Sequence, residues 1–167
     1  MAESRPLQDL LETLPQFGRV EWIGIRPSRE KAMVALEAVQ INLDKGLAGD
    51  RFSGRAGNPR QVTLIQHEHL HVIAACLNRE PIPPSLLRRN IVVSGINLLA
   101  LKDKLFRIGD AVLEFSGLCH PCSKMERQLG RGGYNAMRGH GGITARVCEA
   151  GLVRINDQIS YSKKLNA

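Results

Sequence analysis

The chain has 167 residues, of which 43% are hydrophobic and 23% charged, and its formal net charge is +7 at pH 7. Only 4% of the residues are aromatic, which argues against a stacking surface for single-stranded nucleic acid, and no zinc-finger, helix-turn-helix or RNA-binding signature is present. Nucleic acid is therefore disfavoured as a partner, while the positive charge fits either a small anionic ligand or a scattered basic surface.

The N-terminal residues and the cysteine count bear on the compartment and on the domain organisation. Residues 1–19 carry acidic side chains and lack the apolar run of a signal peptide, and no stretch of the chain approaches the length of a membrane span. We therefore expect a cytoplasmic protein without membrane contact, whose four cysteines are reduced thiols. Leucines that share one face predict an N-terminal arm or short helix within residues 1–19, followed by a single domain over residues 20–167.

Most of the predicted elements are strands, because short apolar runs with β-branched residues lie between turn signals. In chain order, the predicted strands cover residues 20–26, 33–41, 61–65, 90–93, 105–108, 111–115, 143–148 and 158–161. Residues 44–59 form a long irregular stretch, and loops of that length are usually functional or mobile. A helix is predicted over residues 66–77, and one or two helical turns over residues 123–129. Since strands and helices do not alternate, the expected fold class is mainly β (α+β), a mostly antiparallel β-barrel with a few peripheral helices.

The predicted site centres on Cys119-His120-Pro121-Cys122, which lies between a predicted strand and a predicted helix. The start of the helix and Lys124 are expected to favour a thiolate, which is the reactive form of a cysteine. A thioredoxin-like fold is disfavoured, because Pro121 is the last proline of the chain and nothing downstream can supply the cis-proline loop of such folds. Two alternatives stay open at this point, a single reactive thiolate at Cys122 or two structural cysteines.

A second pattern, His67-Glu68-x-x-His71, satisfies the H-E-x-x-H zinc motif on the predicted helix. His67 and His71 would bind the metal and Glu68 would act as general base. The longer metzincin spacing does not follow, and no third ligand is evident. A zinc-dependent hydrolase is therefore kept as the alternative enzyme class.

Arginines and glycines recur at the ends of predicted strands. Arginine forks match phosphate oxygens, and glycine-rich turns let backbone N–H groups approach an anion. No Walker motif and no G-x-G-x-x-G turn occurs. The groups predict either an anionic cofactor bound near a reactive sulfur or a non-enzymatic anion-binding module. They are Gly49-Asp50-Arg51, Arg60-Gln61, Arg88-Arg89-Asn90 and Arg138-Gly139-His140-Gly141-Gly142.

Five blocks of the sequence, in their order and spacing, resemble the MOSC domain, a family named for the C-terminal part of molybdenum-cofactor sulfurases. The blocks cover residues 46–51, 60–65, 88–98, 106–110 and 121–122. The resemblance extends from about residue 20 to residue 161 and is to the small, stand-alone bacterial type. It implies a barrel-containing fold, in which Cys122 of the family's Pro-Cys block carries sulfur as a persulfide or ligates molybdenum.

The resemblance implies two uses of one accessible thiolate. Sulfur would come from a partner cysteine desulfurase, which would itself hold the pyridoxal phosphate; alternatively, the chain would bind the molybdenum cofactor and reduce N-hydroxylated compounds with an electron-transfer partner. Cys122 is then the catalytic residue and metal ligand, with Lys124 and His120 tuning its ionisation. Phe52 stands where many relatives have a histidine, so no role of that histidine is carried over. The implied cofactor-binding residues are Asp50, Arg51, Arg88, Arg89, Asn90, Arg138 and His140.

Overall fold

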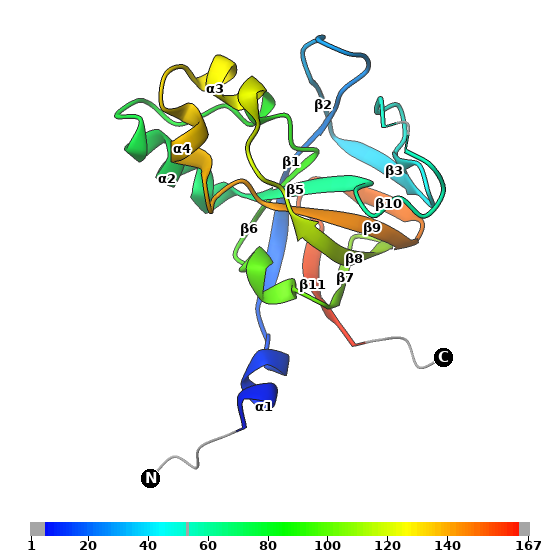
Figure 1. The fold of residues 1–167 in the computed structure, drawn as a ribbon. Helices are drawn as coiled ribbons and strands as arrows, with labels where there is room; N and C mark the ends of the chain where they lie inside the picture. The colour runs from blue at the N-terminus through cyan, green and yellow to red at the C-terminus, as the bar shows by residue number, and fades with distance from the viewer. Residues whose placement is uncertain (1–5, 53, 164–167) are drawn as a thin grey trace.

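The structure, a computed structural model, describes residues 6–52 and 54–163. Its core is a β-barrel of seven strands, which closes where β11 (Gln158–Ser162) pairs with β1 (Phe17–Ile25). Figure 1 shows helices gathered over one end of this barrel. From β11 the strand order continues through β7 (Leu105–Ile108), β8 (Ala111–Leu118), β9 (Ile143–Glu149), β5 (Val62–Gln66) and β6 (Ile91–Ser94) back to β1.

Pairing within the barrel is antiparallel except between β5 and β6, which run parallel. Parallel neighbours need a long crossover connection, and here the chain between the two strands includes a helix. The prediction of a mainly β fold with a mostly antiparallel barrel is therefore confirmed. Aliphatic side chains and one phenylalanine fill the interior without contact to solvent; the largest include Ile23, Ile41, Leu64, Phe106, Ile108 and Leu113.

The single strand predicted over residues 33–41 is wrong, because the chain changes sheets in the middle of it. β2 (Val34–Leu36) extends the barrel sheet beside β1, whereas β3 (Ala38–Asn42) lies in a separate sheet of three strands. The Glu37 carbonyl between them accepts a hydrogen bond from the Ile155 N–H at 3.0 Å, which holds the chain at the bend. The other strands of the small sheet, β10 (Gly151–Arg154) and β4 (Gly46–Leu47), are too short to show a periodic pattern.

Three helices cover one end of the barrel (Figure 1). α2 (His67–Cys76) and α3 (Ser123–Leu129) confirm the predicted helices, whereas the sequence does not predict α4 (Gly133–Met137), because its opening glycines resemble a turn. The 3-10 turn η1 (Pro84–Leu87) belongs to this cap, whereas the 3-10 turn η2 (Leu98–Leu101) buries Leu98 and Leu101 in the barrel core. A second apolar cluster fixes this cap to β5 and β6, and it includes Ile65, Ile73, Leu87, Val92, Met125 and Met137.

The N-terminal helix α1 (Leu7–Glu12) stands apart from the barrel in Figure 1. A short helix is present in the region where an arm or helix was expected, but its leucine face is open to solvent, with Leu7 and Leu10 71% and 55% exposed. Glu12 links it to the body through a hydrogen bond from Tyr161 and an ion pair with Lys104. Among the helices of the described residues, none is long and apolar enough to cross a membrane.

Candidate functional site

Cys122 is exposed and directly precedes α3, one of the three helices of the cap. Its backbone is extended, and its carbonyl accepts the Met125 N–H at 2.8 Å to begin the helix. Cys119 is different, because it is buried with 7% of its surface exposed and its N–H donates to the Gly142 carbonyl at 2.9 Å. Both cysteines are free thiols. The structure thus presents one accessible sulfur and one enclosed sulfur.

Arg89 is a buried cation beside these two thiols. Its guanidinium donates to the carbonyls of Leu87 at 2.9 Å, Cys119 at 3.0 Å and Gly141 at 2.9 Å. Among the described residues, no carboxylate forms an ion pair with it. Burial lowers the pKa of Arg89, and the two neighbouring cysteines, Cys119 and Cys122, offset part of that effect. Arg89 therefore ties three backbone segments together and adds positive charge behind Cys122.

Arg88, the next residue back, faces outward and belongs to a group of arginines. Burial lowers the pKa of its guanidinium, and the charges of Arg26 and Arg51 lower it further. Asp50 and Cys122 act on this pKa in the opposite direction, so all these groups are close enough to interact. The side chain of Arg88 donates only one hydrogen bond to the protein among the described residues, to the exposed Lys31 carbonyl at 3.1 Å. Its remaining donors are available for an anion.

Asp50 anchors this arginine group. Its carboxylate is almost fully buried and accepts a two-pronged interaction from Arg26, with Nη2 to Oδ2 at 2.7 Å and Nε to Oδ1 at 3.1 Å. The Asn90 amide also donates to it at 3.3 Å, while the Asn90 oxygen accepts from Thr63. Burial acts to raise the pKa of Asp50, but Arg26 and the Phe52 N–H more than offset burial and hold it below the ordinary value.

Two of the residues predicted to bind a cofactor, Asp50 and Asn90, thus have internal partners that occupy their polar atoms. Asp50 and Asn90 help to hold the loop that carries Arg51, while Arg89 binds three other backbone segments, and their contact with a cofactor stays a prediction. The Arg51 N–H donates to the Arg26 carbonyl at 2.7 Å, which places that loop against the end of β1. Arg51 itself is exposed. The group therefore consists of buried residues that hold it and exposed arginines that can meet a ligand.

Lys124 lies on the same side as Arg88. Together with Arg127, Gln128 and Glu30, these two residues line an open surface hollow of about 270 Å³. Three of its five lining side chains are basic and one is acidic, so its character is cationic. Because Lys124 is two residues after Cys122, the hollow extends the positively charged surface along the first turns of α3.

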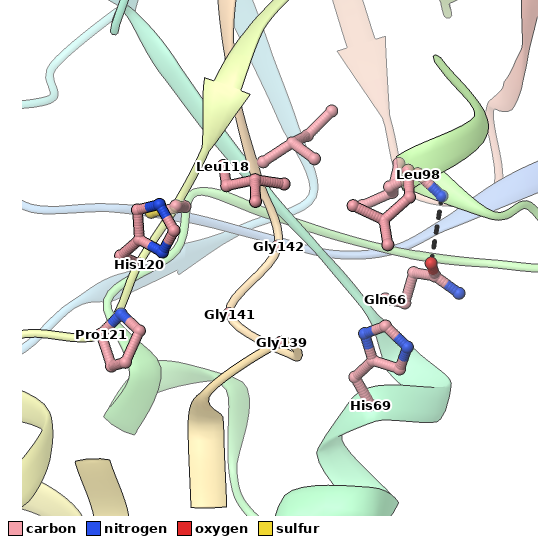
Figure 2. A pocket seen from close by; sticks show the side chains of 12 residues that line it. Gln66, His69, Leu98, Leu118, His120, Pro121, Gly139, Gly141 and Gly142 are labelled. Carbon is pink, nitrogen blue, oxygen red and sulfur yellow. Dashed lines mark hydrogen bonds between the residues drawn. The ribbon is translucent and has the colours of Figure 1, made fainter. Parts of the chain in front are cut away.

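His120, by contrast, lines a second hollow, and His140 lies next to that hollow through its contact with His69. His120 and Pro121 line a cavity of about 100 Å³ together with His69 of α2. Figure 2 shows His69 on one side of this cavity and His120 with Pro121 on the other. The His140 ring packs against His69 with centroids 5.1 Å apart. These histidines thus form a feature distinct from the arginine group.

Arg138 is exposed and donates to Asn135 at 3.4 Å near the end of α4. Its predicted contact with a cofactor phosphate stays a prediction. The residues that the sequence reasoning did not select are Arg26 and His69. Arg26 has a local signal, since it ends a predicted strand and precedes a proline, but its partner Asp50 lies 24 residues later. His69 lies inside the H-E-x-x-H pattern at a position that the motif does not specify, so the sequence gives no reason to select it.

That pattern is present on α2, but its residues face solvent. The rings of His67 and His71 lie 5.1 Å apart, while the Glu68 carboxylate accepts the Gly95 N–H at 2.7 Å and helps to fix the loop after β6. No group of three or more His, Cys, Asp or Glu side chains suited to a metal occurs within residues 6–52 and 54–163. The zinc alternative consequently gains no third ligand from the described residues.

Gly142 is the tightest point of the loop between α4 and β9. Its φ is +86°, and a Cβ there would overlap the carbonyl of Leu64 in β5. Gly139 in the same loop has a similar φ of +80°, but a Cβ there would meet nothing within 4 Å. Glycine at position 142 lets this loop approach β5 and deliver its carbonyl to Cys119.

We expect Gly142→Ala to lower the free energy of unfolding by about 3 kcal/mol, since it combines left-handed strain with a steric clash. Gly139→Ala keeps the strain without the clash and should cost about 1 kcal/mol. Urea denaturation of the two variants measures the difference. Equal losses would show that the close approach to Leu64 contributes nothing.

The fold and this site define a class of protein, a closed β-barrel with an accessible thiol and an arginine group at a helix-capped rim. The MOSC domain family model matches residues 52–160. The chain therefore belongs to the MOSC domain family, as the sequence blocks imply.

Solved structures agree with this fold. YuaD from Bacillus subtilis has a TM-score of 0.73 at 22% identity, over 86% of this chain and 94% of that one. YiiM from Escherichia coli has a TM-score of 0.68 at 18% identity, and the match covers 89% of this chain and 72% of that one. YiiM from Geobacillus stearothermophilus has a TM-score of 0.69 at 15% identity, and the match covers 88% of this chain and 76% of that one. Curated proteins offer no match.

Proposed function

We propose that the chain binds the molybdenum cofactor, with the Cys122 thiolate as the sulfur ligand of the metal. The observation that carries this proposal is the exposed Cys122 sulfur beside arginines, whose charges interact with it. A thiolate is a soft ligand that suits molybdenum as well as a persulfide, and guanidinium groups suit the cofactor's phosphate. The MOSC family is associated with this cofactor, and the residues present fit it.

In this proposal some residues of the chain bind the cofactor's phosphate and others hold those residues in place. Arg51, Arg88 and Lys124 have exposed or partly exposed cationic groups and would hold the phosphate. Asp50 and Arg89 would keep those groups in place, because their own polar atoms already have partners. The bound metal would supply two-electron redox chemistry for the reduction of an N-hydroxylated compound. The electrons would come from a partner protein.

A second candidate function rests on the same exposure of Cys122. A thiolate that is open to solvent can also be reached by another protein, which a buried metal ligand cannot. The Cys122 thiolate would then take the outer sulfur from a persulfide on a cysteine desulfurase, so that an S–S bond forms at Cys122 and the donor cysteine leaves as a thiolate. Pyridoxal phosphate would remain on that partner.

The two candidates differ in what Cys122 carries, so the test is the composition of the protein purified from cells that make the cofactor. We expect molybdenum and pterin in near-equal amounts, measured by elemental analysis and by fluorescence of the oxidised pterin. Protein from cells that cannot make the pterin is the matched control and should contain neither.

Mass spectrometry of the same samples checks the alternatives. Mass equal to one extra sulfur on the peptide that contains Cys122 would favour the carrier over the cofactor-binding protein. A free thiol together with no molybdenum and no pterin would contradict both. Stoichiometric zinc that is lost in His67→Ala would support the hydrolase instead.

A further inference from the structure

The cavity beside Cys119 has features that the proposed function does not use. It lies between the start of α2, η2 and the end of β8, and two of its lining residues, Cys119 and Gly141, accept hydrogen bonds from Arg89, which does not itself line the cavity. Leu98, Leu99, Leu118 and Ile143 supply apolar walls. None of its twelve lining residues is Asp, Glu, Lys or Arg. A charged ligand would therefore find no countercharge there, whereas an uncharged apolar body would be accommodated.

Buried polar atoms at one side of the cavity lack hydrogen-bond partners. His69 lines it, and the Nδ1 atom of His69 is buried without a hydrogen-bond partner among the described residues. The same holds for Nδ1 of His140, whose ring packs edge-on against His69 at 66°. Burying polar atoms without partners costs free energy, and a bound group that satisfies one of them recovers part of that cost.

His69 is poised to accept a hydrogen bond. Burial lowers the pKa of its imidazole, and the charge of His140 lowers it further, against an opposing effect of Glu68. The ring is therefore neutral at neutral pH, and a neutral imidazole always has one nitrogen that accepts. Gln66 does not compete for this role with its side-chain oxygen, because that oxygen accepts the Leu98 N–H at 3.0 Å (Figure 2).

We infer that this cavity is a binding site for a small uncharged molecule with an apolar body and one hydrogen-bond donor, which His69 accepts. The site needs no cofactor, because every group that forms it belongs to the chain. It also adjoins the candidate thiol, since Pro121 lines the cavity and precedes Cys122 in the chain. The inference stands or falls separately from the proposed function.

Pyrrole and furan are suitable probes, since they are rings of nearly the same size and only pyrrole has an N–H donor. An apolar cavity of ~150 Å³ accepts benzene, so a cavity of about 100 Å³ suits these smaller rings. Each is titrated into nitrogen-15-labelled protein, and the amide signals of Leu118, Gly141 and Gly142 are followed. We expect saturable shifts, with pyrrole bound about five- to tenfold more tightly than furan, the usual effect of one hydrogen bond.

Three variants test the assignment. His69→Phe keeps an aromatic ring but removes the acceptor, so pyrrole should lose its advantage over furan. His71→Phe on the exposed side of the same helix is the control and should change neither affinity. Leu118→Trp fills the cavity from a side chain that is 44% exposed, so the fold should tolerate it while both rings lose binding.

Results of two kinds would overturn the inference, one in the unmodified protein and one in the variants. One is the absence of saturable shifts around the cavity with either ring in the unmodified protein. The other is a preference for pyrrole that survives His69→Phe or binding that survives Leu118→Trp.

Discussion

Cys122→Ser is expected to lower the molybdenum content of the protein by on the order of 100-fold or more, since removing even an indirect support of a metal site costs up to about that factor. A serine hydroxyl stays protonated at neutral pH and is a hard oxygen donor, so it replaces neither the soft thiolate ligand nor a sulfur carrier. The folded structure should be unaffected, because Cys122 is exposed and its side chain caps nothing in α3. The free energy of unfolding should change by less than about 0.5 kcal/mol.

Cys119→Ser is the matched control, three residues earlier in the same segment. Cys119 is buried against apolar walls, so a hydroxyl there loses favourable packing and should lower the free energy of unfolding by about 1 kcal/mol. Molybdenum content should persist, because this thiol is enclosed. The two variants thus have opposite signatures. Normal molybdenum and pterin in Cys122→Ser, or equal losses in both variants, would refute the assignment of the metal ligand to Cys122.

The barrel could be predicted from the sequence because its signal is local. Each strand that lies inside one sheet, such as β7 or β9, has its own alternation of apolar residues, and turns mark its ends. The failure at residues 33–41 has the opposite cause. Apolar residues continue from β2 into β3 without a glycine or proline between them, and the hydrogen bond at the Glu37 bend comes from the distant Ile155 N–H. Closure through β1 and β11 is likewise a contact between the two ends of the chain.

In the candidate site, too, features with a local sequence signal could be predicted and features set by distant contacts or by backbone conformation could not. Cys122 could be selected from the sequence, because it lies at a predicted strand-to-helix junction and matches the Pro-Cys block of the family. The distinction between Arg88 and Arg89 has no local signal. Adjacent arginines look alike in sequence, yet one faces solvent and the other points inward, because Arg88 has a left-handed backbone with a φ of +56° at the end of η1. Which arginine can meet a ligand is therefore decided by the turn.

Arg89→Met is expected to lower the free energy of unfolding by about 4 kcal/mol. Replacing a buried charge with an apolar side chain of similar length can be neutral or even favourable when its partners leave with it. Here the partners stay, because they are the backbone carbonyls of Leu87, Cys119 and Gly141. Each unsatisfied buried acceptor costs about 1–3 kcal/mol. The cost of leaving these carbonyls without donors therefore exceeds the free energy gained because the variant no longer buries a cation. Urea denaturation measures the loss.

Arg88→Met is the control, because it removes the same group from the neighbouring residue. Its one hydrogen bond, to the Lys31 carbonyl, is exposed, so water can replace it and the cost should stay below about 0.5 kcal/mol. Arg89→Lys separates charge from geometry, since an ammonium keeps the charge but cannot fork to three carbonyls at once. If the carbonyls matter, this variant should stay closer to Arg89→Met than to the unmodified protein. A loss in Arg89→Met no larger than in Arg88→Met would mean that Arg89 does not hold the Cys119 and Gly141 segments together.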